Sequence, residues 1–534
     1  MNNIMPKVKR AMVATPHYLA TAVGSSILQG GGNAYDAAVA VSAALSVVYP
    51  HMTGLGGDAF FLLYDASRKT YRGYNGSGRS SAAASVEYFK SKGRKEIPHR
   101  GIESALTVPG MADAWWSVWR EGGKLPWHKL IEPAAAYAEE GFPISRNLAE
   151  WIAKDESLLS CDPGMKKTYL PGGQVPREGS ALLQPELAES LRTLQREGRD
   201  AMYTGTLMKR IVEAVRQDGG LLGERDFAEH RGEWVEPLKT RYRGCDVYQM
   251  PPNSQGFSLL MMLNMLENMK LTDVPRHSAE FYHLAAEVVK RAFVERDRYL
   301  TDPEFNNIPL DKLLSKPFAQ ELFRTIRMEG AGLGGEAGSA SIPMGQDTAY
   351  AAIVDEEGNA VSFIQSLYFD FGSCYMAGDT GIILQNRGSF FSLDPSAPNV
   401  LEPRKRSFHT LMPGMVARDG KPYILTGTQG GEGQPQTQLS VLTGVLDYGL
   451  SIREAIELPR WVYGRTWGSE DDSLKVEPRF EAGVEERLSE LGHKVERVRE
   501  WDGIMGQSQG ILIDETGTIS GAADPRGDGS VIGW

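Results

Sequence analysis

The sequence predicts an α+β protein with one continuous core. Its 534 residues are enough for two or three ordinary domains or for one large unit with a continuous sheet core. Helical patterns fill most of the stretch from residue 125 to about residue 218, whereas strand-like runs dominate after residue 347. Hydrophobic residues make up 41% and charged residues 23%, a balance that is typical of a folded soluble protein.

The N-terminal part is expected to form two helices and a β-hairpin. Thr15 and Pro16 have the character of an N-cap and a first helical residue, in a helix that ends at three consecutive glycines. Asn33 is a good N-cap for a second helix over 35–48, whose Ala- and Val-rich sequence suits burial against a sheet. The runs AFFLLYD and TYRGYNG then predict a hairpin, which a Gly/Ser-rich bend containing Arg79 follows.

One long helix and one long loop precede the β-rich part. Apolar residues recur at helical spacing between Ser278 and Leu300, so a packing helix is predicted there. From Glu329 to Asp347 the periodicity stops and Gly, Ser and Ala dominate, which indicates an exposed and mobile loop. Strands are predicted after this loop in the runs AYAAIV, AVSFIQSLY, GIILQN, KPYILTG, SLKVEP and GILIDETG.

The first two of these strands predict a neighbour for Thr348. The loop DEEGN joins them, and its midpoint is Glu357, so strand pairing is counted outward from that residue. Thr348 then lies opposite Ser366, with the two side chains about 5 Å apart on one face. A β-bulge would shift this pairing by one residue.

Thr348 needs a base to act as a nucleophile, because a hydroxyl group alone is a weak one. If the Asp347–Thr348 bond is cut, the freed α-amine, with a pKa near about 8, lies next to the hydroxyl and can take its proton. Ser366 would orient that hydroxyl. Judged from the hairpin alone, an ordinary strand residue after a surface loop is the more frequent explanation of Thr348.

The residues around Thr348 also resemble a known family. The segment 348–386, TAYAAIVDEEGNAVSFIQSLYFDFGSCYMAGDTGIILQN, is similar to the start of the small subunit in the gamma-glutamyltransferase family of N-terminal nucleophile hydrolases. Further similarity extends over essentially the whole chain, in the runs GGGNAYDAAVA, TGLGGDAFF, TVPGMADAW, PPNSQG, TGTQGG and GAADPRGDG. The divergent branch that this chain resembles includes cephalosporin acylases and oxamate amidohydrolases.

The resemblance implies a self-cleaving enzyme with the four-layer αββα sandwich of N-terminal nucleophile hydrolases. Cleavage between Asp347 and Thr348 would give a large subunit, residues 1–347, and a small subunit, residues 348–534. The two would form one intertwined domain, because the strands that flank the cut pair within one core. Thr348 would be the nucleophile of both processing and catalysis, and Ser366 would be its hydrogen-bonding partner.

The resemblance also implies an oxyanion hole and a substrate clamp. Gly430 and Gly431 match a glycine pair whose backbone N–H groups stabilise the oxyanion. Arg79 matches an arginine that holds the substrate carboxylate, a task that suits its planar fork. The implied reaction forms an acyl-enzyme from gamma-glutamyl compounds such as glutathione and passes the acyl group to water or to an amine.

Five positions in the implied substrate site depart from the family pattern. Tyr368, Arg387 and Phe390 replace the Asn, Gln and Asp that hold the glutamyl α-amino group in members that handle glutathione. His409 and Thr410 replace a serine pair that holds the α-carboxylate, and they still offer hydrogen bonds. A second expectation is therefore an amidohydrolase or acylase for another small anionic amide, of the oxamate or the glutaryl and cephalosporin type.

The composition limits the expected partners and location. The net charge is −11 and no Lys/Arg stripe is present, so nucleic acid is not an expected partner. No secretory signal or membrane-spanning stretch is visible, which favours the cytoplasm. Cys161, Cys245 and Cys374 are expected to be buried free thiols. The expected partners are a small amide substrate and the two pieces of the precursor, without a metal or an organic cofactor, and a homo-oligomer is left open.

Two motifs match those of other enzyme classes in residue type and spacing but not in their predicted structural context. The GxGxxG spacing that begins at Gly330 follows a helix and precedes a loop, whereas a dinucleotide site needs a strand before it and a helix after it. The GxSxG spacing around Ser508 precedes a predicted strand, whereas a nucleophile elbow precedes a helix. A serine hydrolase that uses Ser508 and a non-catalytic scaffold that kept the fold remain the rival expectations.

Overall fold

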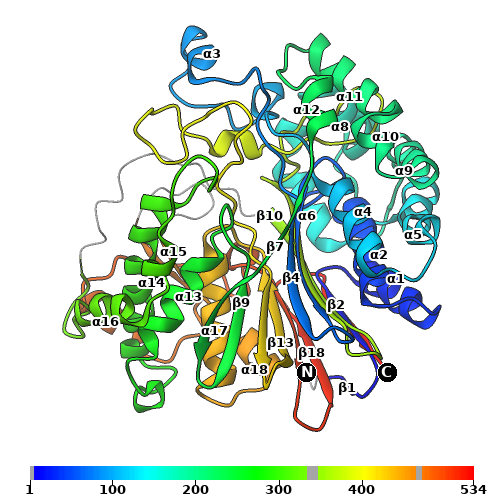
Figure 1. The fold of residues 1–534 in the computed structure, drawn as a ribbon. Coiled ribbons are helices and arrows are strands. Elements are labelled where there is room, and N and C mark those ends of the chain that lie inside the picture. Colours follow the sequence, from blue (N-terminus) through cyan, green and yellow to red (C-terminus); the bar gives the residue numbers. More distant parts are fainter. Residues whose placement is uncertain (1–4, 333–346, 465–471) are drawn as a thin grey trace.

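The computed structural model describes residues 5–332, 347–464 and 472–534, and these form four layers. Two antiparallel sheets of seven described strands each pack face to face, and helices cover both outer faces (Figure 1). The strands of the first sheet are, in spatial order, β19 (Ser530–Gly533), β2 (Met12–Thr15), β10 (Asp347–Val354), β11 (Ala360–Tyr368), β3 (Asp58–Asp65), β4 (Thr70–Asn75) and β7 (Glu233–Val235). Those of the second sheet are β1 (Lys7–Val8), β18 (Ile519–Ala523), β17 (Ser508–Ile513), β13 (Lys421–Thr428), β12 (Gly414–Arg418), β9 (Cys245–Gln249) and β8 (Leu238–Tyr242).

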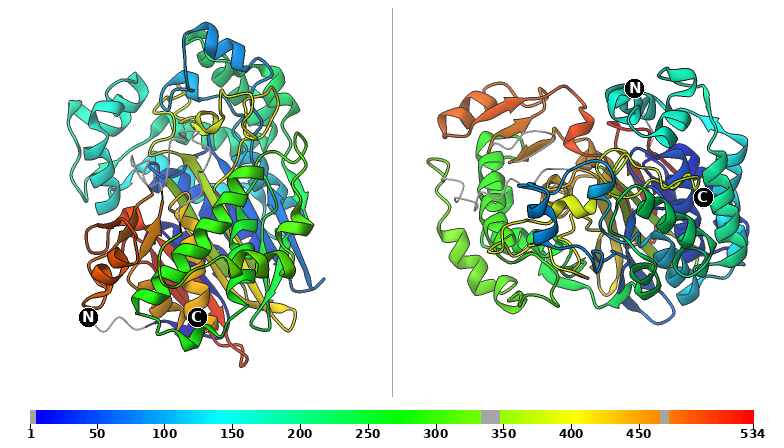
Figure 2. Two further views of the ribbon diagram at one scale, coloured as in Figure 1. Left: turned by 90° about the vertical axis from the view of Figure 1, so that its left-hand side faces the viewer. Right: turned by 90° about the horizontal axis from the view of Figure 1, so that it is seen from above.

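The two outer helix layers come from different halves of the chain, as the view from above shows (Figure 2). The first sheet is covered by α1 (Tyr18–Gln29), α2 (Ala34–Val48), α4 (Met111–Gly122), α5 (Trp127–Glu140) and α9 (Pro185–Glu197). The second sheet is covered by α13 (Gly256–Leu266), α14 (Ala279–Tyr299), α17 (Gly433–Leu446) and α18 (Ile452–Glu457). The expected α+β fold with an αββα sandwich is therefore confirmed.

A separate apolar core lies between the two sheets. Alternate residues of β10, namely Tyr350, Ala352 and Val354, belong to it together with Met415 of β12 and Leu425 of β13. The intervening residues of β10 belong to the core on the helix side of the sheet, where α2 lies against the strand. This alternation is the packing expected of a strand that is buried on both faces.

The predicted helices largely agree with the structure, with one error at the first helix start. Asn33 caps α2 through a capping box with Asp36, and Ser278 caps α14, as their sequences suggest. Thr15 belongs to β2 instead of capping α1, and His17 is the N-cap. The helical stretch after residue 125 is confirmed by α5 and α9 and by α6 (Arg146–Lys154), α7 (Glu156–Leu159), α8 (Pro163–Tyr169), α10 (Asp200–Tyr203) and α11 (Thr206–Gln217).

Most of the predicted strands are present, but GIILQN is not one of them. Its residues form single bridges, Gly56 with Leu384 and Met376 with Ile383, and their apolar side chains are buried in the helix-side core. SLKVEP contains β15 (Leu474–Val476), which pairs with β14 (Trp461–Tyr463) and β16 (Val495–Arg497) in a small third sheet. The predicted loop from residue 329 to 347 lies mostly outside the described residues.

The cysteine prediction is partly wrong, since Cys161 is exposed. Cys245 and Cys374 are buried, and all three thiols are free. Within the described ranges, no helix combines the length and the apolar character needed to cross a bilayer.

Candidate active site

Thr348 lies at the head of β10, a central strand of the first sheet, and only 1% of the residue is exposed. From Ala349 to Val354 the strand pairs with β11 as counted outward from Glu357. A bulge interrupts the register between Asp347 and Ala349 and brings Asp347 opposite Tyr368. Bulges beside active sites commonly re-aim a side chain, and this one contains Thr348.

Ser366 occupies the neighbouring position on β11. Its hydroxyl oxygen accepts a hydrogen bond from the backbone N–H of Tyr368 at 2.7 Å, and on its other side Ser366 pairs with Asp58 of β3. The residue is fully buried. The hairpin prediction therefore holds for the strands, and the bulge that it allowed for is present at Thr348.

The glycine pair Gly430–Gly431 follows β13, which lies across the sandwich from β10. The ring of Tyr350, two residues after Thr348, packs so closely on Gly427 that a β-carbon there would overlap it. The φ angles of Gly430 and Gly431 are 122° and 52°, both in the region that favours glycine. The two glycines thus continue β13, the strand that faces β10 and Thr348.

The backbone N–H groups of Gly430 and Gly431 have no hydrogen-bond acceptor among the described residues. Their carbonyls are used, because Gly430 accepts from the N–H of Gly433 at 2.7 Å and Gly431 from that of Gln434 at 3.2 Å. The pair lies directly before α17, whose N-terminus adds positive potential. Two free donors at a helix N-terminus can stabilise an oxyanion.

A buried polar network fixes this glycine turn. The Nε2 atom of Gln255 donates to the carbonyls of Gly431 at 3.0 Å and Thr410 at 2.9 Å, and its Oε1 atom accepts from Arg296 at 3.1 Å. Arg296 is fully buried and also forms an ion pair with Glu432 at 3.0 Å. A network in which each member is engaged holds the turn rigidly.

Three residues that were predicted to contact substrate lie together. The guanidinium of Arg387 is stacked 4.2 Å from the ring centroid of Tyr368, and the rings of Tyr368 and Phe390 meet edge-on at 5.1 Å. Arg387 and Phe390 belong to one short 3-10 turn, η4 (Arg387–Phe390). Burial lowers the pKa of Arg387 to about 10, so it stays charged at neutral pH.

Asp58 and His409 lie beside this group as a hydrogen-bonded pair, 3.3 Å apart. Burial raises the pKa of Asp58 to about 6, although the charge of Arg387 opposes this shift. Burial and the same arginine lower the pKa of His409 well below its usual value. His409 is therefore neutral, and it also packs edge-on against Phe60.

Arg79 is not grouped with these residues in the structure. Within the described part of the chain, its guanidinium forms ion pairs with Glu233, Asp302 and Glu304 and donates to the carbonyl of Arg404. It lines a separate cavity of about 410 Å³. Its role as a carboxylate clamp stays a prediction, and a substrate would compete there with three protein carboxylates.

Comparison with known proteins identifies the architecture. A family model described as Gamma-glutamyltranspeptidase matches residues 20–534. The chain belongs to the gamma-glutamyltranspeptidase family. A Bacillus subtilis protein named glutathione hydrolase-like YwrD proenzyme is 51% identical, and the match covers 98% of each chain. A Klebsiella pneumoniae protein named oxamate amidohydrolase proenzyme is 37% identical, again over 98% of each chain.

A solved structure of cephalosporin acylase from Bacillus halodurans also shares the fold. It superposes with a TM-score of 0.92 at 35% identity and covers 100% of this chain and 97% of the other. The resemblance inferred from the sequence is thus confirmed for the family, for the fold and for an enzyme of the gamma-glutamyltranspeptidase type. The roles of the individual site residues stay predictions.

Three residues of this gamma-glutamyltranspeptidase site escaped sequence reasoning. Asp58 and Gln255 lie in TGLGGDAFF and PPNSQG, two runs that resemble the family, so their motifs were a usable signal. Arg296 is buried near the end of α14 and had none. Apart from the adjacent Asp297, its partners Gln255 and Glu432 come from distant parts of the chain, and only the fold brings them together.

Ser508 is not placed like a nucleophile in this family member. It is buried at the start of β17, its hydroxyl donates to the carbonyl of Gly427 at 2.9 Å, and its N–H donates to Asp524 at 2.9 Å. The predicted strand after it is confirmed. Of the other misleading motif, Gly330 and Gly332 are described without a strand before them, and the third glycine lies outside the described residues.

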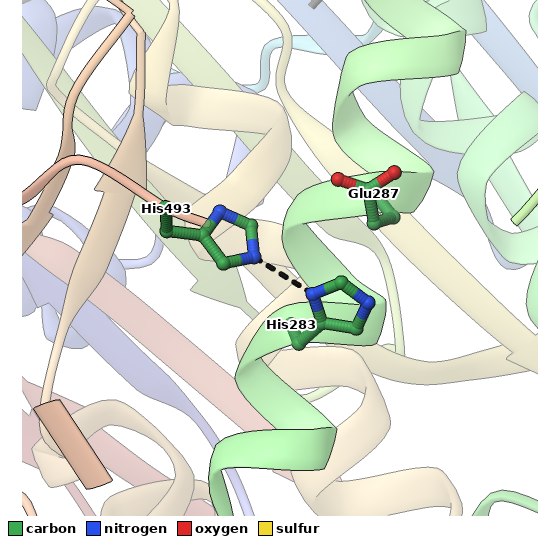
Figure 3. A group of neighbouring side chains, drawn as sticks. All are labelled: His283, Glu287 and His493. Atoms are coloured by element: carbon green, nitrogen blue, oxygen red, sulfur yellow. Dashed lines mark hydrogen bonds between the residues drawn. The ribbon is translucent and has the colours of Figure 1, made fainter. Parts of the chain in front are cut away.

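A cluster of potential metal ligands lies away from this site. Figure 3 shows His283 and Glu287 on α14 beside His493, with candidate ligand atoms within 4.8 Å of one another. The two imidazoles are hydrogen-bonded at 2.8 Å. Both Glu287 oxygens already bind cations, Lys290 at 2.8 Å and Arg291 at 2.7 Å. A metal ion would have to displace these partners, and with them in place the cluster is a packing contact of α14.

Proposed function

We propose that this chain is a self-processing amide hydrolase and acyl transferase with Thr348 as its N-terminal nucleophile. The observation that carries the proposal is the position of Thr348. It lies in a bulge at the head of a central strand, with Ser366 on the next strand. Across the sandwich, Gly430 and Gly431 follow the strand that packs on Tyr350, and their N–H groups have no acceptor within the described ranges. These are the parts that acyl transfer requires.

Processing would begin with attack of the Thr348 hydroxyl on the carbonyl carbon of Asp347. The C–N bond between the two residues breaks, an ester forms, and the nitrogen leaves as the α-amine of Thr348. Water then hydrolyses the ester, which restores the hydroxyl and leaves Asp347 with a free carboxylate. The products are residues 1–347 and residues 348–534.

Turnover would use the amine that processing creates. It takes the proton of the Thr348 hydroxyl as the oxygen attacks a substrate amide, and it returns the proton to the departing amine. The N–H groups of Gly430 and Gly431 would stabilise the tetrahedral oxyanion, and water or a second amine would then accept the acyl group. His409 and Thr410 would border the substrate.

A gamma-glutamyl amide such as glutathione is the first candidate substrate. The relatives support it, since the names of several at 30% identity or more contain glutathione hydrolase. A second candidate, another small anionic amide, is favoured by Arg387, which stands where an uncharged amide is expected in glutathione-handling members. Relatives named oxamate amidohydrolase and acylase support this second reading.

Incubation of the purified chain tests the proposal directly. We expect the 58.7 kDa precursor to convert into two polypeptides that remain together in gel filtration. Mass spectrometry should assign the new N-terminus to Thr348. A chain that stays intact after prolonged incubation would overturn the proposal and would favour a non-catalytic scaffold that kept the fold. Labelling of Ser508 by a phosphonate would favour a serine hydrolase.

Ser366→Ala is expected to slow both processing and turnover while the fold stays intact. Removing one hydroxyl leaves the strand ladder unchanged but takes away a partner that would orient Thr348. A loss of about 10- to 100-fold in each rate corresponds to one hydrogen bond to a reacting group. Gel densitometry gives the processing rate and release of the amine product gives the turnover rate. Ser362→Ala on the same strand is the control. Equal rates in wild type and Ser366→Ala would remove Ser366 from the mechanism.

A further inference from the structure

Arg387 is a buried cation whose guanidinium has no hydrogen-bond partner in the described part of the chain. Only 1% of the residue is exposed, and its Nε, Nη1 and Nη2 atoms have no acceptor among the described residues. A guanidinium keeps its charge and carries five N–H donors. Burying such a group without acceptors is strongly unfavourable. Among the described residues no acceptor meets these donors, and an anionic group that entered the site would supply one.

The neighbours of Arg387 leave its donors available. Tyr368 covers one face of the guanidinium, which stabilises the cation but uses no N–H group. Asp58 is the nearby negative charge, yet its Oδ1 atom accepts from Gly78, Gly110 and Gln385, and its Oδ2 atom is paired with His409. The remaining edge of the fork has the geometry that binds a carboxylate through two parallel hydrogen bonds.

Arg387 is also close to the proposed nucleophile. Tyr368, on which it stacks, pairs with Asp347, and the N–H of Tyr368 binds the Ser366 hydroxyl. An acyl group attached to Thr348 therefore starts next to the ring that holds the guanidinium. A carboxylate at the far end of a short acyl chain is the group that would suit the free edge of this guanidinium.

An α-ammonium group has no comparable receptor here. The two other positions that would hold it are aromatic, Tyr368 and Phe390. Asp58, the carboxylate whose charge acts on Arg387, already has four partners. A like charge beside Arg387 is repelled. Arg79, the other arginine considered for substrate, is already paired with three carboxylates.

We infer that Arg387 binds the far carboxylate of the acyl donor, so that the substrates are monoamides of short dicarboxylic acids and an α-amino group is not required. This inference rests on the proposed function. It changes the role expected at this position, from holding an amino group to selecting a carboxylate. Arg387 is then the residue that decides which acyl groups enter.

Four p-nitroanilides separate the two charged groups of a gamma-glutamyl donor: butyryl, 4-aminobutyryl, glutaryl and gamma-glutamyl. For the processed wild type we expect kcat/KM for the glutaryl compound to exceed that for the butyryl compound about 10- to 100-fold. The 4-aminobutyryl compound should do no better than butyryl. Arg387→Gln should reduce the glutaryl-to-butyryl ratio to near one, and Arg387→Lys should give an intermediate ratio.

A matched control is Arg418→Gln, because Arg418 also stacks on a ring, Tyr423 at 3.7 Å, but lies exposed on β12. The glutaryl-to-butyryl ratio of kcat/KM for Arg418→Gln should equal that of the wild type. A second measurement does not need turnover: glutarate should raise the melting temperature of the processed wild type whereas butyrate should not, and Arg387→Gln should lose this difference.

The inference is overturned if the wild type shows no preference for carboxylates in either assay. It is equally overturned if Arg79→Gln abolishes the preference while Arg387→Gln keeps it. Failure of the proposed function looks different, because then the chain does not cleave itself at Thr348. A self-cleaved enzyme that hydrolyses butyryl and glutaryl amides equally well would refute only the assignment of Arg387.

Discussion

Thr348→Ala is expected to remain a single chain of 58.7 kDa and to have no measurable amidase activity. The substitution removes the hydroxyl that attacks in both reactions. It also prevents release of the α-amine that serves as the base. Loss of a nucleophile typically lowers turnover by at least about 10⁴-fold. Gel electrophoresis after prolonged incubation and release of a chromogenic amine check the two parts of this prediction.

Thr348→Ser is the matched control, since serine keeps the hydroxyl and the amine. It should process and turn over, at reduced rates. Thr348→Ala should melt within a few degrees of the unprocessed wild type, and processed Thr348→Ser within a few degrees of the processed wild type, because Thr348 heads its strand and adds little to the cores. Normal cleavage at residue 347 in Thr348→Ala would exclude Thr348 as the processing nucleophile.

Gly430→Ala is expected to lower kcat by about 10²- to 10³-fold, the usual cost of losing an oxyanion donor. The backbone at Gly430 has a φ of 122°, which a residue with a β-carbon adopts only with strain of about 1–3 kcal/mol. The turn is expected to relax by rotating the peptide groups on either side. The N–H groups of Gly430 and Gly431 would then point away from the oxyanion.

Gly420→Ala controls for strain alone. Gly420 also has a positive φ, 77°, and a β-carbon there meets no other atom within 4 Å, because the residue lies in the exposed turn between β12 and β13. It should lose stability to a similar extent but keep kcat. The measurement is kcat on fully processed samples together with the melting temperature. A Gly430→Ala enzyme with wild-type kcat would remove this turn from catalysis.

The strands around the site could be predicted because their interactions are local. The β10–β11 register follows from a five-residue loop centred on Glu357, and α2 and α14 carry their caps next to their apolar stripes. The bulge at Thr348 was allowed for but could not be located. Its position depends on how the strand end meets Tyr368 and the rest of the fold.

Non-local contacts account for what the sequence did not show. GIILQN has the composition of a strand, yet Leu384 and Gln385 bond to Tyr375 and Gly56 in loops, so no ladder forms. The ion pairs of Arg79 reach residues more than 150 positions away, which no local pattern reveals. The fold and the β10–β11 hairpin were thus accessible from sequence, whereas the charge environment of each arginine needed the structure.

The mixing of strands from the two proposed pieces has a consequence for a cell that makes two versions of this chain at once. β10 lies between β2, from the first piece, and β11, from the second, while β9 of the first piece borders β12 of the second. Once cut at Thr348, the pieces could separate only by breaking ladders in both sheets. The products of two alleles expressed together would therefore not exchange subunits. Each active site would be built from a single translated chain. An inactive variant would therefore not lower the activity of an active one by exchanging subunits with it.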